Sequence, residues 1–279
     1  SKYEASTVAY QKAIKHFIQA KAPAYRWYSE GRLGLAEWRL NKIEQAQKRF
    51  EQVAIHGESL NLLKLVRSAY NNVGLMQWRK RDIHAAIATY RKSLALTDIT
   101  EAQLLKQNIN GIEYNHIPII NNLALAYQTL GQTNKAFNIY LTKIKATEFI
   151  NFELATYKGI INLTDLMQSE SLYDQALLQL NKANKIKNDN KNETFPPWWS
   201  NQLPILYGRV YQGLGLNNLA RHHFRQALKK TDAENFKKQR LKTLLALYEI
   251  QNQLPEAQQW FKEAESLVQG AKLPVQEAK

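Results

Sequence analysis

One short phrase occurs twice in this sequence, and it limits the folds open to the chain more than any other feature does. Residues 34–39 read GLAEWR, and residues 74–79 read GLMQWR, 40 positions later. Each copy precedes an amphipathic segment. A phrase that returns at a fixed period of this length is typical of proteins built from repeated supersecondary units. The sequence therefore predicts a repeat array.

Alanines mark the second helix of each expected repeat. Each is followed four residues later by a large apolar residue, so that the two share one helix face. The pairs are Ala46 with Phe50, Ala86 with Tyr90, Ala136 with Tyr140, Ala176 with Leu180, Ala220 with Phe224, and Ala257 with Phe261. Twelve positions before these alanines stand Gly34, Gly74, Ala124, Thr164, Gly208 and Leu245, most of them small enough for close helix approach. The pattern predicts an all-α solenoid of antiparallel helix pairs.

In this spacing the chain resembles the tetratricopeptide repeat family, whose pattern is L-G-x2-Y followed by A-x3-F. The clearest copy is NLALAYQTLG at residues 122–131. The resemblance implies a right-handed superhelix of about six repeats after one N-terminal helix. Glu37, Gln77 and Met167 replace the pattern's tyrosine, and its closing proline is generally missing.

We expect one array over residues 1–279. It divides into a partial repeat at 1–22, repeats at 24–58, 60–98, 99–148, 149–188, 198–231 and 233–269, and a tail at 270–279. Since a hairpin of two four-turn helices needs about 34 residues, the wider alanine spacing predicts insertions, most clearly at 99–117 and 187–203. The second contains Trp198 and Trp199, which pack over a repeat junction or contact a partner.

The net charge of +14 favours acidic partners. The strongest bias runs from Arg221 to Lys242, with only Asp232 and Glu234 against eight basic residues. Solvated helix faces are one explanation, and nucleic-acid binding is a weaker alternative. No apolar run is long enough to span a membrane. We therefore expect a soluble chain, from cytoplasm or periplasm, and uncapped array ends leave a homodimer open.

No motif in the sequence indicates catalysis. There is no cysteine, and none of the six histidines stands in a zinc-binding motif. Phosphate-binding glycine loops and nucleophile elbows are also missing from the sequence. We expect no enzyme activity, no metal and no cofactor.

The candidate binding residues lie on the first helices, on the side turned away from the second helices. Val73 and Gly74 define a buried stripe, so at 100° per residue Asn72, Leu75 and Arg79 point the other way. Applying the same frame to the other repeats gives the full set: Arg32, Leu35, Arg39, Asn71, Asn72, Leu75, Arg79, Asn121, Asn122, Leu125 and Asn162. Trp38 and Trp78 fall between this surface and the packed one.

The family resemblance implies that the first helices line a concave groove. In some long members asparagines in the groove hold a peptide main chain, which implies that role for Asn72, Asn122 and Asn162. We therefore expect a non-catalytic module for an extended acidic peptide or partner segment, with leucines supplying apolar contact and arginines selecting charge. Two alternatives remain: the asparagines bridge neighbouring helices or are solvated, or the chain is a sensory segment of a larger bacterial-type signalling or transcription-regulating protein.

Overall fold

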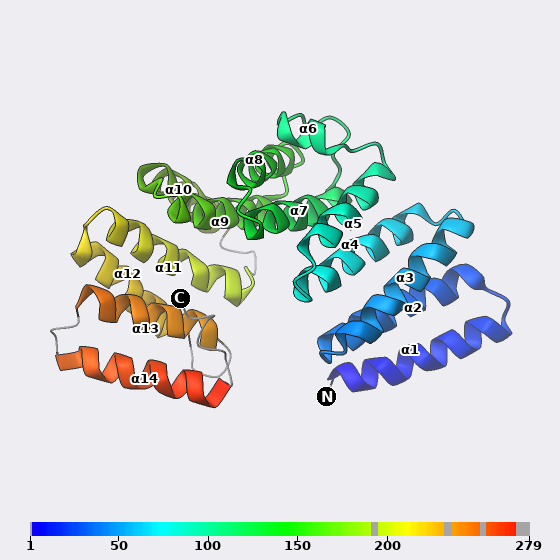
Figure 1. Ribbon diagram of the computed structural model, residues 1–279, viewed down its shortest axis with the longest axis horizontal. Helices are drawn as coiled ribbons and strands as arrows, with labels where there is room; N and C mark the ends of the chain where they lie inside the picture. The colour runs from blue at the N-terminus through cyan, green and yellow to red at the C-terminus, as the bar shows by residue number, and fades with distance from the viewer. Residues whose placement is uncertain (1, 191–194, 232–235, 252–254, 272–279) are drawn as a thin grey trace. The chain divides into compact units, whose positions relative to one another are not determined.

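The computed structural model describes residues 2–190, 195–231, 236–251 and 255–271, and every regular element in these ranges is helical (Figure 1). The expected all-α array of antiparallel helix pairs is confirmed. The chain divides into two compact units, residues 1–151 and residues 152–279, which are described separately.

Unit 1 begins with one helix that packs on the first of the three hairpins that follow. Its elements are α1 (Lys2–Gln19), α2 (Pro23–Arg39), α3 (Ile43–Ser59), α4 (Leu63–Arg79), α5 (Ile83–Ala95), α6 (Glu101–Leu105), the 3-10 turn η1 (Tyr114–His116), α7 (Ile117–Thr129) and α8 (Thr133–Phe149). Each long helix packs on the next one in the chain, and α4 also contacts both α2 and α7. The first helices α2, α4 and α7 therefore form one layer of the unit.

Unit 2 has three hairpins of the same kind. Its elements are α9 (Glu153–Ser169), α10 (Tyr173–Asp189), α11 (Pro197–Gly213), α12 (Asn217–Lys230), α13 (Lys237–Ile250) and α14 (Pro255–Ala271). Here α11 contacts both α9 and α13. The first helices again form one layer.

From α2 to α5 the helices start 20 residues apart, and no extra segment is inserted between them. Helices α2, α3 and α4 are each 17 residues long and start at positions 23, 43 and 63. Between them the chain turns at Asn41 and Asn61, which have positive φ. The amide of Lys42 bonds to the carbonyl of Glu37, the six-residue ring of a Schellman cap. Long helices with short turns, not extra segments, thus explain the 40-residue period.

The core confirms the packing role of the alanines. All six, from Ala46 to Ala257, are fully buried. Opposite them, a methyl group added at Gly74 would lie 2.5 Å from the Tyr90 ring, so this glycine is what lets the aromatic ring lie against its backbone. The last pair is the exception, because Phe261 is 42% exposed and Trp260 takes the buried place. Residues three and four positions after an alanine both lie near the helix face that carries the alanine. After Ala257 the larger ring, that of Trp260, is the one buried on this face.

The insertion at 99–117 forms a separate short helix on the outside of α8. Thr100 caps α6 by accepting a hydrogen bond from the Gln103 amide, and the Thr142 hydroxyl of α8 donates to the Leu104 carbonyl at 2.5 Å. At the end of the insertion His116 is buried, and its Nδ1 accepts a hydrogen bond from the Glu113 amide at 2.9 Å.

The second predicted insertion, at 187–203, contains Trp198 and Trp199. The side chains of these two residues lie outside the described part of the chain. The same holds for residues 191–194 and 272–279.

Candidate functional site

The exposed and half-exposed candidate residues of α2, α4 and α7 form what we call the first-helix face. It consists of Arg32, Leu35, Trp38, Arg39, Asn72, Leu75, Trp78, Arg79, Asn122 and Leu125. The arginines are exposed, and the other members are half-buried. Because α4 contacts α2 and α7 directly, the face is continuous across the three helices.

The leucines of this face rest on the core between helices. Leu35 and Leu75 are partly buried against a cluster of Ala46, Phe50, Val73 and Met76, together with Trp38 and Ile43. Leu125 is half-buried on α7. Leu35 and Leu75 are fixed on their inner side, and all three leucines keep part of their apolar surface in water. Such partly exposed apolar surface next to charged groups is typical of interaction sites.

Trp38 carries guanidinium groups from two helices. Arg39 lies with its Cζ 4.4 Å from the centre of the Trp38 ring, and Arg79 of α4 lies 5.7 Å from it. Trp78 instead joins α4 to α7, because its Nε1 donates to the Thr129 hydroxyl at 3.1 Å. The tryptophans therefore stabilise the junctions between first helices and also position charge on the face. The N–H groups of a guanidinium lie in its own plane. When the guanidinium stacks on an aromatic ring, they therefore stay free to bond an acceptor.

The five candidate asparagines have four different surroundings. Asn122 Nδ2 donates to Asn71 Oδ1 at 2.9 Å, which joins α7 to α4 as the bridging alternative expected. Asn72 makes no side-chain hydrogen bond to any other residue that the structure describes. Asn121 does not reach the face: it is 2% exposed, and its Oδ1 accepts from the buried ammonium of Lys143 at 3.0 Å. Asn162 lies half-buried on α9 of unit 2.

Asn121 was predicted to lie on the binding face but is buried, and the reason is geometric. It precedes the face residue Asn122 by one position, which turns its side chain by about 100° toward the second helix of its own hairpin. There the Lys143 ammonium needs an oxygen acceptor, because an ammonium buried without one would be costly. Asn71 occupies the equivalent position in α4 but stays half-buried and bonds to Asn122 instead.

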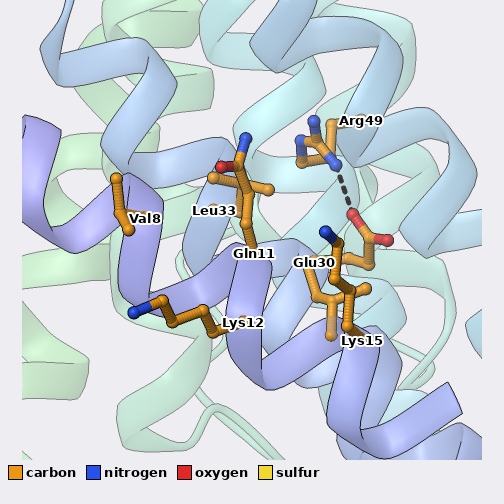
Figure 2. A pocket seen from close by; sticks show the side chains of 8 residues that line it. Val8, Gln11, Lys12, Lys15, Glu30, Leu33 and Arg49 are labelled. Carbon is orange, nitrogen blue, oxygen red and sulfur yellow. Dashed lines mark hydrogen bonds and ion pairs between the residues drawn. The ribbon is translucent and has the colours of Figure 1, made fainter. Parts of the chain in front are cut away.

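A cavity of about 560 Å³ lies on the other side of α2, between α1, α2 and α3 (Figure 2). Arg49 of α3 points to Glu30 of α2 there, and Lys12 and Lys15 extend from α1. The guanidinium also binds Glu37, with Nε at 2.7 Å and Nη2 at 2.8 Å from the carboxylate oxygens. Burial lowers the pKa of Arg49, but the two carboxylates outweigh it and the pKa is raised.

The Arg49 cluster explains why Glu37 replaces the tyrosine of the repeat pattern. The carboxylates of Glu30 and Glu37 are nearly buried, and both bind the guanidinium of Arg49. The cluster therefore stabilises the hairpin of α2 and α3. In the next repeat Gln77 takes the same place, and its Oε1 accepts from the Thr89 hydroxyl at 2.8 Å.

The basic residues between Arg221 and Lys242 do not all belong to one surface. Arg240 is half-buried, pairs with Glu263, and donates to the carbonyl oxygens of Leu228 and Thr231 at 3.0 and 2.6 Å. Lys242 lines a cavity on the first-helix layer of unit 2. Asp232 and Glu234 lie outside the described residues. The run of charge in the sequence is thus divided between structural contacts and separate surfaces.

Two further features bear on what the chain can do. Among the described residues, no group of histidine and carboxylate side chains is arranged to hold a metal ion. None of the helices in the described ranges combines the length and the apolar character needed to cross a bilayer.

Comparisons with known proteins support the repeat architecture. The profile of the Tetratricopeptide repeat family matches residues 68–98, in α4 and α5. Comparison with curated protein sequences gives no match. Among solved structures, BtubC (BKLC) from P. vanneervenii is similar with a TM-score of 0.68 and 16% identity, over 82% of this chain and 91% of that one.

Two other solved structures are similar at comparable identity. A tetratricopeptide repeat protein from Parabacteroides merdae ATCC 43184 matches with a TM-score of 0.55 and 13% identity, over 90% of this chain and 82% of that one. A Rap protein complexed with Competence and Sporulation Factor matches with a TM-score of 0.62 and 14% identity, over 97% of this chain and 77% of that one. At these identities the likeness concerns the fold.

Proposed function

We propose that this chain, which is an array of tetratricopeptide repeats, is a protein-binding module that receives an extended acidic peptide segment on the first-helix face of unit 1. The observation that carries the proposal is the pair of exposed arginines, Arg39 and Arg79, stacked on one tryptophan beside partly exposed leucines. The same fold in a Rap protein complexed with Competence and Sporulation Factor is consistent with a role in binding.

Charge supports an acidic ligand. Arg32, Arg39 and Arg79 are exposed, and none of them forms an ion pair with a carboxylate in the described ranges. Stacking on Trp38 fixes two of the three guanidinium groups, so a ligand carboxylate would meet donors that are already oriented. A preoriented cation loses less side-chain entropy on binding than a free one. The net charge of +14 adds a long-range attraction for acidic segments.

The amides support binding of a main chain. Asn72 is half-buried and has both its donor and its acceptor available. The bond between Asn122 and Asn71 uses one donor and one acceptor, and it leaves Asn71 Nδ2 and Asn122 Oδ1 without a described partner. A carboxamide that offers both a donor and an acceptor matches the N–H and C=O groups of an extended peptide. Leu35, Leu75 and Leu125 would contact alternate side chains of such a segment.

The test is selection from a random peptide library displayed to the purified chain. We expect the selected peptides to be enriched in Asp and Glu. Their affinity should fall by about tenfold in the variant Arg39→Gln/Arg79→Gln, since each lost contact is a charge-assisted hydrogen bond. Asn72→Ala should weaken peptides of every composition, because the main chain is common to all.

Lys48→Gln is the matched control, because Lys48 is an exposed cation of α3 outside the first-helix face. Selection of peptides without acidic enrichment would refute the charge argument. Equal affinity of acidic peptides for the double arginine variant and for Lys48→Gln would remove the first-helix face from the site.

A further inference from the structure

Unit 2 has a cavity of about 830 Å³ on its own first-helix layer. It is lined by α9, α11 and α13, with contributions from α10 and α14. The lining includes the positions that correspond, repeat by repeat, to the leucines and tryptophans of the first-helix face in unit 1. Here those positions hold Arg209, Gln168, Gln212 and Glu249. The first-helix layers of the two units, each considered by itself, therefore present different side-chain chemistry.

Two cations in this cavity lack a close counter-ion. Arg209 Nη1 lies 3.9 Å from Asp165 Oδ1 and 3.5 Å from Gln168 Oε1, both at the outer limit of a useful contact. Lys242 is half-buried and makes no hydrogen bond or ion pair with any other residue in the described ranges. Burial and the nearby Arg209 lower the pKa of Lys242, and Asp165 offsets this only in part. The pair would be stabilised by an anion placed between them.

One wall of the same cavity is apolar. Leu245, Tyr248 and Phe261 line it, and the rings of Tyr248 and Phe261 lie 5.3 Å apart. Phe261 is 42% exposed although it belongs to an alanine-based core pair that is buried in the other hairpins. An exposed ring beside a half-buried one offers contact surface for an apolar group.

The charge of the lining favours a single negative charge. Glu249 stands on the side of Gln212, whose Nε2 donates to it at 3.4 Å. The lining thus holds two cations and one carboxylate. Asp165, outside the lining, lies 3.9 Å from Arg209, so Lys242 is the cation that no described carboxylate contacts. One ligand carboxylate would supply that contact, whereas a dianion would meet repulsion from Glu249.

We propose that the cavity of unit 2 binds a monocarboxylate that carries an apolar group. The carboxylate accepts hydrogen bonds from Arg209 and Lys242, and the apolar group lies against Tyr248 and Phe261. This chemistry has two sources, a free aryl or alkyl carboxylic acid and the terminal residue of a peptide with an apolar side chain. The site is separate from the first-helix face of unit 1 and does not depend on it.

Calorimetric titration of the purified chain with phenylbutyrate tests the proposal. Phenylbutyramide, which has the same shape without the charge, and butyrate, which lacks the ring, are the matched probes. The tripeptide Ala-Ala-Phe with a free carboxylate and its terminal amide form the second arm. We expect either acid to bind at least about tenfold more tightly than its amide. A tighter tripeptide identifies a peptide end as the source, and a tighter phenylbutyrate identifies a free acid.

Lys242→Gln is the primary variant, because Lys242 has no described bonding partner whose loss would disturb the fold. It should weaken the acid by about tenfold, with circular dichroism unchanged. Phe261→Ala should weaken phenylbutyrate but not butyrate. Lys229→Gln, an exposed cation of α12 outside the cavity, should change nothing. Arg79→Gln in unit 1 should also leave phenylbutyrate binding intact, which separates the two sites.

Three results would overturn the proposal. The first is equal binding of the acids and their amides, and the second is no binding of either acid. The third is an affinity of Lys242→Gln for phenylbutyrate equal to that of Lys229→Gln.

Discussion

Removal of Arg49 should destabilise unit 1 more than a surface change of the same size. Arg49 binds both oxygens of Glu37 and also pairs with Glu30. The side chains of the two glutamates are only 2% and 12% exposed. Arg49→Met keeps most of the side-chain volume and removes the charge. Two carboxylates would then remain in the interior without a cation.

The size of the loss follows from burial. Removing one partner of a buried ion pair costs about 3–5 kcal/mol, because the remaining charge stays desolvated. Since the Arg49 side chain is 23% exposed, water can relieve part of that cost. We expect the lower end of the range, about 3 kcal/mol, which is roughly a 100-fold change in the unfolding equilibrium. Urea denaturation of the wild type and the variant, followed by circular dichroism, measures it.

Two further variants serve as controls for Arg49→Met. Lys48→Met removes an exposed cation from the same helix and should change the free energy of unfolding by less than about 0.5 kcal/mol. Glu37→Gln/Arg49→Met removes the most deeply buried carboxylate as well and should recover part of the stability. The reasoning is wrong if Arg49→Met behaves like Lys48→Met, or if the double variant is no more stable than Arg49→Met alone.

Two further predictions concern glycine packing and acid stability. Gly31→Ala should stabilise the chain by up to about 1 kcal/mol through helix propensity, because the added methyl group meets its nearest side chain at 3.6 Å. Gly74→Ala should instead cost about 1–3 kcal/mol, because the Tyr90 ring stands 2.5 Å away; urea titrations giving both the same sign would contradict this. Burial and a neighbouring guanidinium lower the pKa of His116 below its ordinary 6.5, so its contribution is fully present above that pH and lost as the pH falls. Thermal melts of His116→Asn across this window should show a shallower acid loss than wild type, and melts of the exposed-site variant His84→Gln should not.

The spacing of alanines in the sequence was sufficient to predict the hairpins, but not their length. The 40-residue period suggested insertions because it was compared with shorter hairpins. The structure has 17-residue helices joined by turns at residues such as Asn41, Asn61 and Arg81. A left-handed turn residue that is not glycine is a weak signal in a sequence, since asparagine and arginine also occur on helix surfaces.

Side-chain partners were harder to predict than helix faces. Periodicity assigns Asn72 and Asn122 to one side of their helices, because it depends only on 100° steps. It could not predict that the ammonium of Lys143, 22 positions after Asn121, would donate a hydrogen bond to the amide oxygen of Asn121. It also gave no reason for Glu37, whose partner Arg49 belongs to the next helix. Such pairs depend on which side chains the packing brings together.

The cavity residues of unit 2 were within reach of the sequence. Extending the repeat frame to the fifth and sixth hairpins would have placed Arg209, Gln212, Lys242 and Glu249 on the first-helix layer. Lys242 was instead grouped with a linear run of basic residues, because nearness along the chain was given more weight than helical phase. In the structure the Arg240 side chain bonds to the Leu228 carbonyl, whereas Lys242 lines the cavity.

The 20-residue step that separates the starts of α2, α3, α4 and α5 has a consequence for how such a chain can grow. A tandem copy of 40 residues adds one whole hairpin, with every side chain of the copy in the phase of its parent. Helices of unit 1 make their main contacts with their neighbours along the chain, so the copy would find the same partners and only one seam would be new. The phrases at 34–39 and 74–79 stand one such step apart. They are what two copies of one segment would look like after two core-side positions had changed, from Ala36 to Met76 and from Glu37 to Gln77, while the leucine, tryptophan and arginine of the first-helix face stayed the same.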